Sequence, residues 1–301
     1  MKISLAKFFF LLVLLSCLIL FIRPIGDPDF WWHIKTGQLI LQDRAIPHVD
    51  QYSFSAYGKS WIAHEWLSEV ILFLSYRIGG VTFTQIIFAL LTLIAFGMSI
   101  TCTLDKSNPY ARGISLFLGF LMSTPVLWAR PQILSLLNFS FVYFLLHKFS
   151  RTGKWKFIYP IPFIMVFWVN EHGSYILGLG LIGIYFVGQI IDKFVKGFKI
   201  NSIDSRAFSK RILIWAGLFL ISFLVTFINP NGSKMIFYPF HTINDPSLQA
   251  YIQEWASPDF HDTTWIPLAV MLLALIGFGM NNRKTFSITE VLLAIVFGAL
   301  A

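Results

Sequence analysis

Apolar runs long enough to cross a bilayer recur along the whole chain, separated by polar segments. A spanning helix needs about 20 apolar residues, and on that criterion the pattern predicts about nine spans. The predicted spans cover residues 5–22, 81–104, 113–128, 132–147, 157–169, 175–191, 212–228, 265–280 and 288–301. The expected fold class is therefore all-α, a polytopic transmembrane helix bundle that forms one integral membrane module over residues 1–301.

Two of the polar segments are long, residues 25–80 and residues 229–264. Within the first, residues 66–76 are apolar on one side but too few to span a bilayer. Earlier in the same segment Phe30, Ile34, Gly37 and Leu41 follow one another at the spacing of a single helix face. The pattern predicts two helices that lie at the membrane interface within this first loop.

The charges indicate which side of the membrane each loop faces. If the N-terminus is cytoplasmic and the spans alternate, most of the 23 Lys and Arg residues lie inside, as the positive-inside rule requires. The net charge of +8 is then a property of the cytoplasmic loops and does not indicate a nucleic acid partner. The same assignment places most acids, and every histidine except His147, outside. We expect a multi-pass protein of a bacterial cytoplasmic membrane, with its chemistry on the extracytoplasmic face.

Composition supports the membrane class and adds one expectation about the C-terminus. The chain is 56% hydrophobic and 13% charged, whereas a soluble domain keeps about a quarter of its residues charged. Both cysteines, Cys17 and Cys102, fall in apolar runs, so no disulfide framework is expected. The last apolar run continues to Ala301 without a flanking charge, and we expect a C-terminally truncated module.

The first candidate for chemistry is Asp27-Pro28-Asp29, at the start of the long first loop. Proline biases the residue before it toward an extended backbone, in which residues i and i+2 face the same side. Two carboxylates on one side could bind a divalent cation such as Mg or Mn together with a phosphate. Alternatively, one of them could act as a general base, or Asp29 could simply cap the next helix.

Other candidates lie on the predicted outer face. His64 and Glu65 belong to a polar helix face with Ser68 and Glu69, which either borders a cleft or is merely solvated. Arg130 suits phosphate binding or snorkelling to lipid headgroups. Four further candidates are His33 in the first interfacial helix, Glu171 and His172 in a short outer turn, and Glu254 between two aromatic residues that could stack on a sugar or anchor the loop.

At these residues the chain resembles the bacterial GT-C superfamily of multi-pass glycosyltransferases, which use sugars carried on polyprenyl phosphate. The fragments that carry the resemblance are Trp31-Trp32-His33, His64-Glu65-Trp66, Arg130-Pro131-Gln132, Trp168-Val169-Asn170-Glu171-His172-Gly173 and Asn229-Pro230-Asn231-Gly232. The order of parts also matches, because an acidic first outer loop with two interfacial helices precedes paired spans. The resemblance covers nearly the whole chain.

The resemblance implies an enzyme that moves a sugar from a polyprenyl-phosphate carrier to an envelope glycan, lipid or protein, with inversion. An acid near the start of the first outer loop is the base in such enzymes, which implies Asp29 or Asp27, and the aromatic helix after Asp29 favours Asp29. Donor phosphate binding then falls to Arg130, His172 and Glu171, and the acceptor cleft to His33, His64, Glu65 and Glu254. No cofactor other than a divalent cation at Asp27 and Asp29 is expected.

Two other classes of function remain open from the sequence. A lipid or solute transporter, or a flippase, places ionisable groups near the bilayer midplane, and the predicted span interiors are almost free of charge. A non-enzymatic envelope-assembly protein would not need the clustered outer His, Glu and Asp residues. Both observations favour the transferase.

Overall fold

The computed structural model describes residues 5–21, 24–102, 109–124, 126–196, 202–246, 248, 252, 258–281 and 287–300. Across these ranges the fold is helical and contains no strand, apart from an isolated bridge between Val49 and Ser60. The expected all-α class is therefore confirmed for the described part of the chain.

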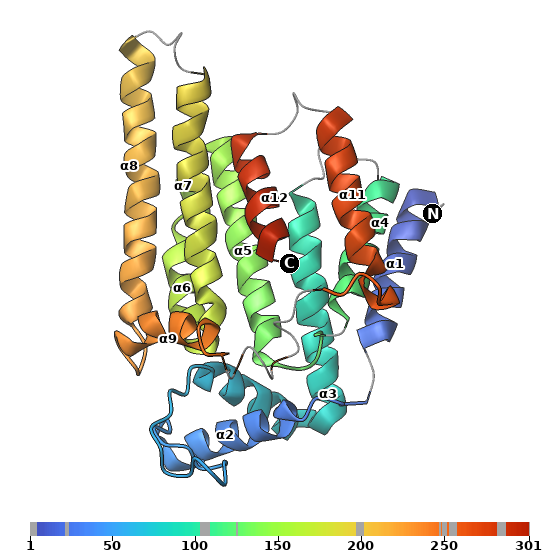
Figure 1. The fold of residues 1–301 in the computed structure, drawn as a ribbon, viewed down its shortest axis with the longest axis vertical. Coiled ribbons are helices and arrows are strands. Elements are labelled where there is room, and N and C mark those ends of the chain that lie inside the picture. Colours follow the sequence, from blue (N-terminus) through green and yellow to red (C-terminus); the bar gives the residue numbers. More distant parts are fainter. Residues whose placement is uncertain are drawn as a thin grey trace.

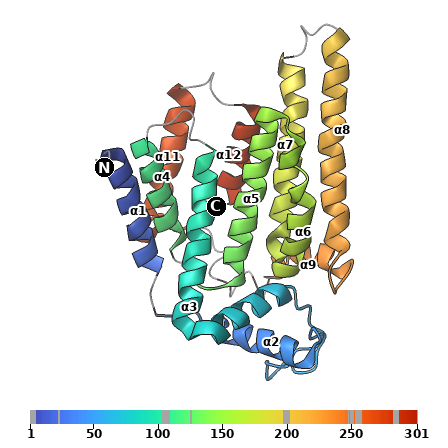
Figure 2. The same cartoon turned by 180° about the vertical axis from the view of Figure 1, so that it is seen from behind.

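Most helices stand side by side in one bundle (Figure 1). The upright helices are α1 (Leu5–Phe21), α4 (Pro109–Ser123), α5 (Pro131–Thr152), α6 (Pro160–Glu171), α7 (Ile176–Lys196), α8 (Ser202–Leu224), α11 (Ile266–Asn281) and α12 (Ile288–Leu300), together with the second half of α3 (Trp66–Thr101). Figure 2 shows the same order from behind, with α1 at one edge and α8 at the other. Helices α3 and α5 pack against each other in the middle.

Four helices of the described chain are long and apolar enough to cross a membrane, namely Trp66–Thr101, Pro131–Thr152, Gly173–Asp192 and Lys210–Phe227. Three shorter apolar helices cover Tyr110–Ser123, Thr263–Gly277 and Ile288–Gly298. Every predicted span coincides with a helix, and α6 is the shortest because Pro160 begins it late. The molecule is thus an apolar helical protein suited to a lipid bilayer.

Helix α3 changes direction at Gly79 and Gly80, where the backbone leaves helical geometry. Gly80 has φ +66° and ψ −159°, a conformation that is essentially restricted to glycine. Before this kink, residues 66–78 lie across one end of the bundle beside α2 (Asp29–Asp43), and after it the helix enters the bundle (Figures 1 and 2). The predicted interfacial helix and the predicted span that follows it are therefore two arms of one helix.

Replacing Gly80 by alanine is expected to destabilise the protein, because the new Cβ must adopt a backbone conformation that costs about 1–3 kcal/mol. The control is Gly97→Ala in the same helix, where an added Cβ meets no atom within 4 Å. Thermal unfolding of both variants in detergent would show a lower midpoint for Gly80→Ala alone. Equal midpoints for the two variants would contradict the assigned kink.

The buried face of α2 differs from the predicted one. Phe30, Ile34 and Gly37 are buried as expected, but Leu41 is 41% exposed. Ile40 is buried instead, because α3 packs on the side of α2 that carries His33 and Ile40. The prediction for Leu41 was wrong since it followed apolar spacing alone.

Residues 66–78 bury their polar side as well as part of their apolar side. Ser68 and Glu69 are fully buried, whereas Leu74, on the apolar side, is 41% exposed. The solvated-face interpretation of this helix is therefore wrong. Ser68 and Glu69 turn toward the protein together with Leu72, which is also 0% exposed, whereas Leu74 turns outward.

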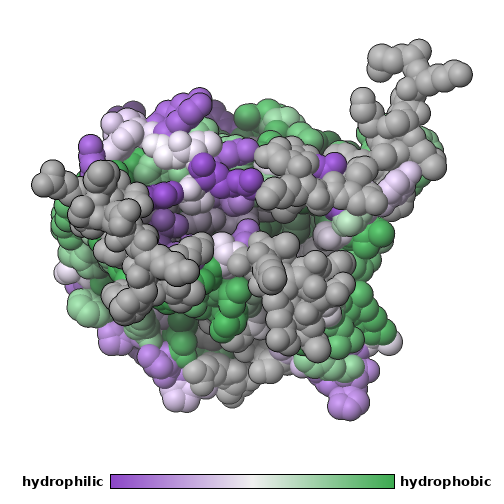
Figure 3. Space-filling view, turned by 90° about the horizontal axis from the view of Figure 1, so that it is seen from above, coloured by the Kyte–Doolittle hydropathy of each residue, from purple (hydrophilic) through white to green (hydrophobic). Residues whose placement is uncertain are grey.

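The end of the bundle that lies away from α2 carries basic side chains. Lys148 and Arg151 lie in the last turns of α5, and Arg211 of α8 donates a hydrogen bond to the Ser150 carbonyl. Figure 3 views this end and shows hydrophilic side chains gathered on it, with hydrophobic ones around much of its edge. The bases named here thus lie at the end of the bundle away from α2, whereas Asp27 and Asp29 lie at the α2 end together with Arg130.

Candidate functional site

Asp27, Asp29 and Arg130 meet at the end of the bundle where α2 begins. Arg130 ends the turn before α5, and its Nε lies 2.9 Å from Asp27 Oδ2. Its Nη2 donates to Asp29 Oδ2 at 2.9 Å. One guanidinium therefore bridges two carboxylates that belong to a distant part of the chain.

The local backbone differs from the expected extended one. Pro28 is in the right-handed helical region, at φ −65° and ψ −27°. Asp29 begins α2 without capping it, and Asp27 Oδ1 accepts the Asp29 backbone N–H at 3.1 Å instead. A turn together with Arg130, rather than an extended strand, brings the two carboxylates together.

The two carboxylates differ in access. The Asp27 side chain is 5% exposed and the Asp29 side chain is 43% exposed. Burial raises the pKa of Asp27, and the Arg130 guanidinium partly offsets this effect. Asp29 is therefore the carboxylate of this pair that a substrate can reach, while Asp27 is a buried partner of Arg130.

A second charged cluster lies one helical turn further along α2. Glu65 Oε1 is 3.2 Å from His172 Nε2 and 3.7 Å from His64 Nε2. The other Glu65 oxygen, Oε2, is 3.8 Å from His33 Nδ1, and Glu69 Oε1 lies 3.4 Å from the same nitrogen. The His–Glu cluster, as we call these five residues, joins α2, the start of α3 and the turn after α6.

Hydrogen bonds indicate the tautomers of two of these histidines. The backbone N–H of Ser174 donates to His172 Nδ1 at 3.0 Å, so the proton of the neutral ring is on Nε2 and points to Glu65. His64 Nδ1 faces the Ile62 carbonyl at 3.3 Å, which leaves Nε2 to accept from the Tyr238 hydroxyl at 3.3 Å. Burial lowers the pKa of His64, in keeping with a neutral ring.

The two glutamates of the cluster have different acidities. Burial alone would raise the pKa of Glu65, but His64, His172 and His33 together bring that pKa below its usual range. Burial raises the pKa of Glu69 to about 7, although its contact with His33 opposes the shift. Glu69 lies in the arm of α3 before the kink, outside the bundle. The same cluster thus lowers the pKa of one glutamate and raises that of the other.

A framework of hydrogen bonds fixes the α6 turn against α3. Ser68 Oγ donates to the Glu171 carbonyl at 2.7 Å, and Trp66 Nε1 donates to Asn170 Oδ1 at 2.9 Å. The Glu171 carboxylate turns away from the His–Glu cluster and accepts from Asn138 Nδ2 of α5. Glu171 therefore connects helices at the edge of the site, while its neighbour His172 faces the cluster.

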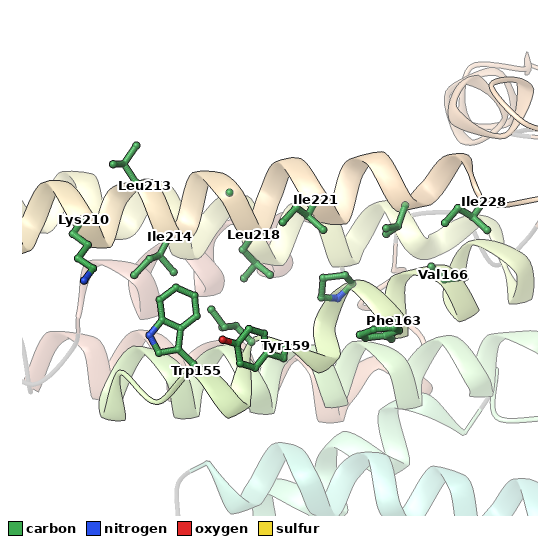
Figure 4. A pocket seen from close by; sticks show the side chains of 14 residues that line it. Trp155, Tyr159, Phe163, Val166, Lys210, Leu213, Ile214, Leu218, Ile221 and Ile228 are labelled. Carbon is green, nitrogen blue, oxygen red and sulfur yellow. The ribbon is translucent and has the colours of Figure 1, made fainter.

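Two cavities lie near the site. The smaller, of about 390 Å³, lies beside His64 and is lined by Ile62, Lys234, Phe237, Tyr238 and His241. The larger, of about 680 Å³, is an apolar groove that runs along α6 and α8 (Figure 4). Its lining includes Trp155, Tyr159, Phe163, Leu213, Gly217 and Ile221, with Lys210 toward one end.

The structure brings most of the predicted site residues to one end of the bundle. Asp27, Asp29 and Arg130 form one group, and His33, His64, Glu65 and His172 belong to the next. Glu171 borders them, and Glu254 lies outside the described residues. The predicted cation at Asp27 and Asp29 stays a prediction, and Arg130 supplies positive charge to both carboxylates.

Sequence reasoning did not select three contributors to this site. Glu69 was recognised as part of a polar face, and its spacing of four residues from Glu65 was the available signal. Asn138 was noticeable only as a polar residue inside a predicted span, and Tyr238 carried no local signal, because the roles of both depend on which helices pack together. Comparisons of the chain with protein-family models, with curated proteins and with solved structures give no match.

Proposed function

We propose that this chain is a membrane glycosyltransferase that moves a sugar from a polyprenyl-phosphate carrier to an envelope acceptor on the extracytoplasmic face of a bacterial cytoplasmic membrane. About nine crossings with a cytoplasmic N-terminus would put the charged end of the bundle outside. The observation that carries the proposal is the exposure of Asp29 beside Arg130. Asp29 is the exposed carboxylate of a largely buried acid–arginine group, held by Arg130 at the end of an apolar bundle.

In the proposed reaction Asp29 takes the proton from an acceptor hydroxyl. The acceptor oxygen forms a bond to the anomeric carbon while the bond from that carbon to the phosphate oxygen breaks. The carrier phosphate leaves with the electron pair, and the anomeric centre inverts. A carboxylate serves as such a base when it lies within hydrogen-bond reach of the hydroxyl.

Charge on the leaving phosphate needs a cation or hydrogen-bond donors nearby. Arg130 holds Asp29 and lends positive charge to this end of the site. His172 and His64 have side chains that are 18% exposed, and the cavity beside His64 adds Lys234 and His241. These groups are our candidates for phosphate binding, and the half-exposed Asp29 is our candidate for contact with the acceptor.

The apolar groove along α6 and α8 suits the prenyl chain of the donor. It follows the depth of the bundle and is almost wholly apolar. Its lining includes Ile228, whose carbonyl accepts a hydrogen bond from Asn170 at 2.8 Å, and Asn170 in turn binds Trp66 at the start of α3. A prenyl chain in this groove would therefore end near the charged site.

Gly217→Phe is expected to fill part of this groove, since an added Cβ there meets no atom within 4 Å. The Michaelis constant should rise about tenfold for a long-chain donor, equivalent to about 1.4 kcal/mol of lost binding, and change little for a short-chain donor. The control is Gly180→Phe on α7, which is similarly open and does not line the groove. Equal effects of both variants on both donors would rule out this use of the groove.

The proposed activity is tested with a panel of radiolabelled polyprenyl-phosphate sugars and the purified protein. The longest reading frame that contains residues 1–301 should be assayed beside the chain itself. Transfer or slow hydrolysis of one donor, with release of free polyprenyl phosphate, is the expected result. If the protein neither binds nor cleaves any lipid-linked sugar, the transferase proposal fails.

A further inference from the structure

His33, Glu65 and Glu69 form a compact set of metal-ligand side chains within the His–Glu cluster. We propose that these three residues bind one divalent transition-metal ion of the zinc type. One nitrogen or oxygen atom from each of the three lies within 4.8 Å of the others, and all three residues are buried. This site is distinct from the Asp27–Asp29 pair, whose carboxylates contact Arg130.

The spacing of the ligand atoms is close to what such an ion requires. Zinc binds imidazole nitrogen and carboxylate oxygen at about 2.0–2.2 Å, so neighbouring ligands of a tetrahedral ion lie about 3.3 Å apart. His33 Nδ1 is 3.4 Å from Glu69 Oε1 and 3.8 Å from Glu65 Oε2. Small side-chain rotations would close the set around an ion.

The second observation is an unpartnered buried oxygen. Glu69 is 0% exposed, and its Oε2 has no hydrogen-bond partner. A buried carboxylate oxygen without a partner is costly, and a second buried carboxylate from Glu65 lies beside it. A divalent cation between them would compensate both charges at once, which the single imidazole of His33 does not do.

The surroundings resemble those of a metal site in one further respect. Ligating carboxylates are normally held by outer hydrogen bonds. Glu65 turns Oε2 toward His33, while its Oε1 faces His172 Nε2 at 3.2 Å. The imidazole ligand favours zinc or another transition metal over magnesium or calcium, which prefer oxygen.

An ion at this site would tie α2 to the first arm of α3. His33 follows Asp29 by one helical turn, so the ion would also fix the position of the proposed base. The inference does not rest on the proposed transfer reaction, because metal binding can be measured in a protein that transfers nothing. Failure of one proposal is therefore distinguishable from failure of the other.

In the test, the purified protein carries no histidine tag and is first freed of metal by chelation and dialysis. The zinc that it then binds from added zinc is measured. We expect about one zinc per chain by elemental analysis and calorimetry. Glu69→Gln and His33→Asn should each weaken zinc binding at least tenfold, while Glu290→Gln and His241→Asn, at residues outside the set, should leave it unchanged. Size-exclusion elution of each variant checks that it is folded. If only one of Glu69→Gln and His33→Asn folds, that variant alone is sufficient for the test.

Two results would overturn the inference. One is a folded wild-type protein that binds no zinc, cobalt or manganese at micromolar concentration. The other is a folded Glu69→Gln or His33→Asn variant that binds zinc as tightly as the wild type. Zinc binding that the control substitutions also abolish would equally contradict it, because the ion would then lie elsewhere.

Discussion

Asp29→Asn is expected to lower sugar transfer about 10²–10⁴-fold, the range typical of losing a general base. The amide keeps the shape of the carboxylate, and its oxygen can still accept the hydrogen bond from Arg130 Nη2. What it loses is the ability to take a proton from the acceptor. Because the side chain is 43% exposed, the change should leave folding and expression intact.

The matched control for this variant is Asp43→Asn, the same substitution at the exposed last residue of α2. It should transfer sugar at the wild-type rate. Initial rates with a saturating donor, normalised to folded protein by size-exclusion elution, provide the comparison. Full activity in Asp29→Asn would remove Asp29 from the mechanism, and Asp27 would then be the next acid to test.

Gly37→Ala is expected to have the second-largest effect, because α2 and α3 touch at this residue. An added Cβ would lie 2.1 Å from the Glu69 carbonyl oxygen and 2.8 Å from Phe73 Cβ. Both distances are far shorter than van der Waals contact, and one of the neighbours is backbone. The two helices must separate, at a cost of about 1–3 kcal/mol for overpacking.

The separation should damage activity more than stability. His33 of α2 faces Glu65 and Glu69 across this contact, and Asp29 lies on the same helix. A displacement of about 1 Å in such a site can cost about 10²-fold in rate. Gln38→Ala, at the next position of α2, is the control and should change neither activity nor the unfolding midpoint. If Gly37→Ala keeps wild-type activity, α2 is not held against α3 as described.

The apolar pattern was sufficient to predict the helical architecture. Each predicted span became a helix because burial of apolar residues, in lipid or in protein, requires internally bonded backbone. The helices at residues 29–43 and 66–78 were also anticipated, the second because Trp66 through Tyr76 was too short an apolar stretch to span. The sequence did not predict that residues 66–78 and the next span form one kinked helix, because that connection depends on the backbone of Gly79 and Gly80.

The candidate residues were found more readily than their arrangement. Charged and imidazole side chains stand out in an apolar chain, and their predicted side of the membrane grouped them. Sequence spacing could not show that Arg130 contacts both Asp27 and Asp29, since that pairing requires the start of α5 to meet the start of α2. It also suggested an extended Asp27–Asp29 segment, whereas Pro28 turns the chain there.

The inward polar face of residues 66–78 was the least predictable feature. An amphipathic helix at a membrane surface usually buries its apolar side, and here Glu69 is buried while Leu74 is exposed. The burial of this polar side depends on two histidines from elsewhere, His33 on α2 and His172 after α6, which provide partners for Glu65 and Glu69. No pattern within one helix carries that information.

The most direct test of the proposed function follows one labelled polyprenyl-phosphate sugar in proteoliposomes that contain the wild-type protein and an acceptor. The transferase proposal predicts that sugar appears on the acceptor, with inverted configuration, in step with an equal amount of free polyprenyl phosphate. Asp29→Asn should show neither product. Movement of the intact donor across the bilayer, without cleavage, would contradict the proposal and indicate a transporter.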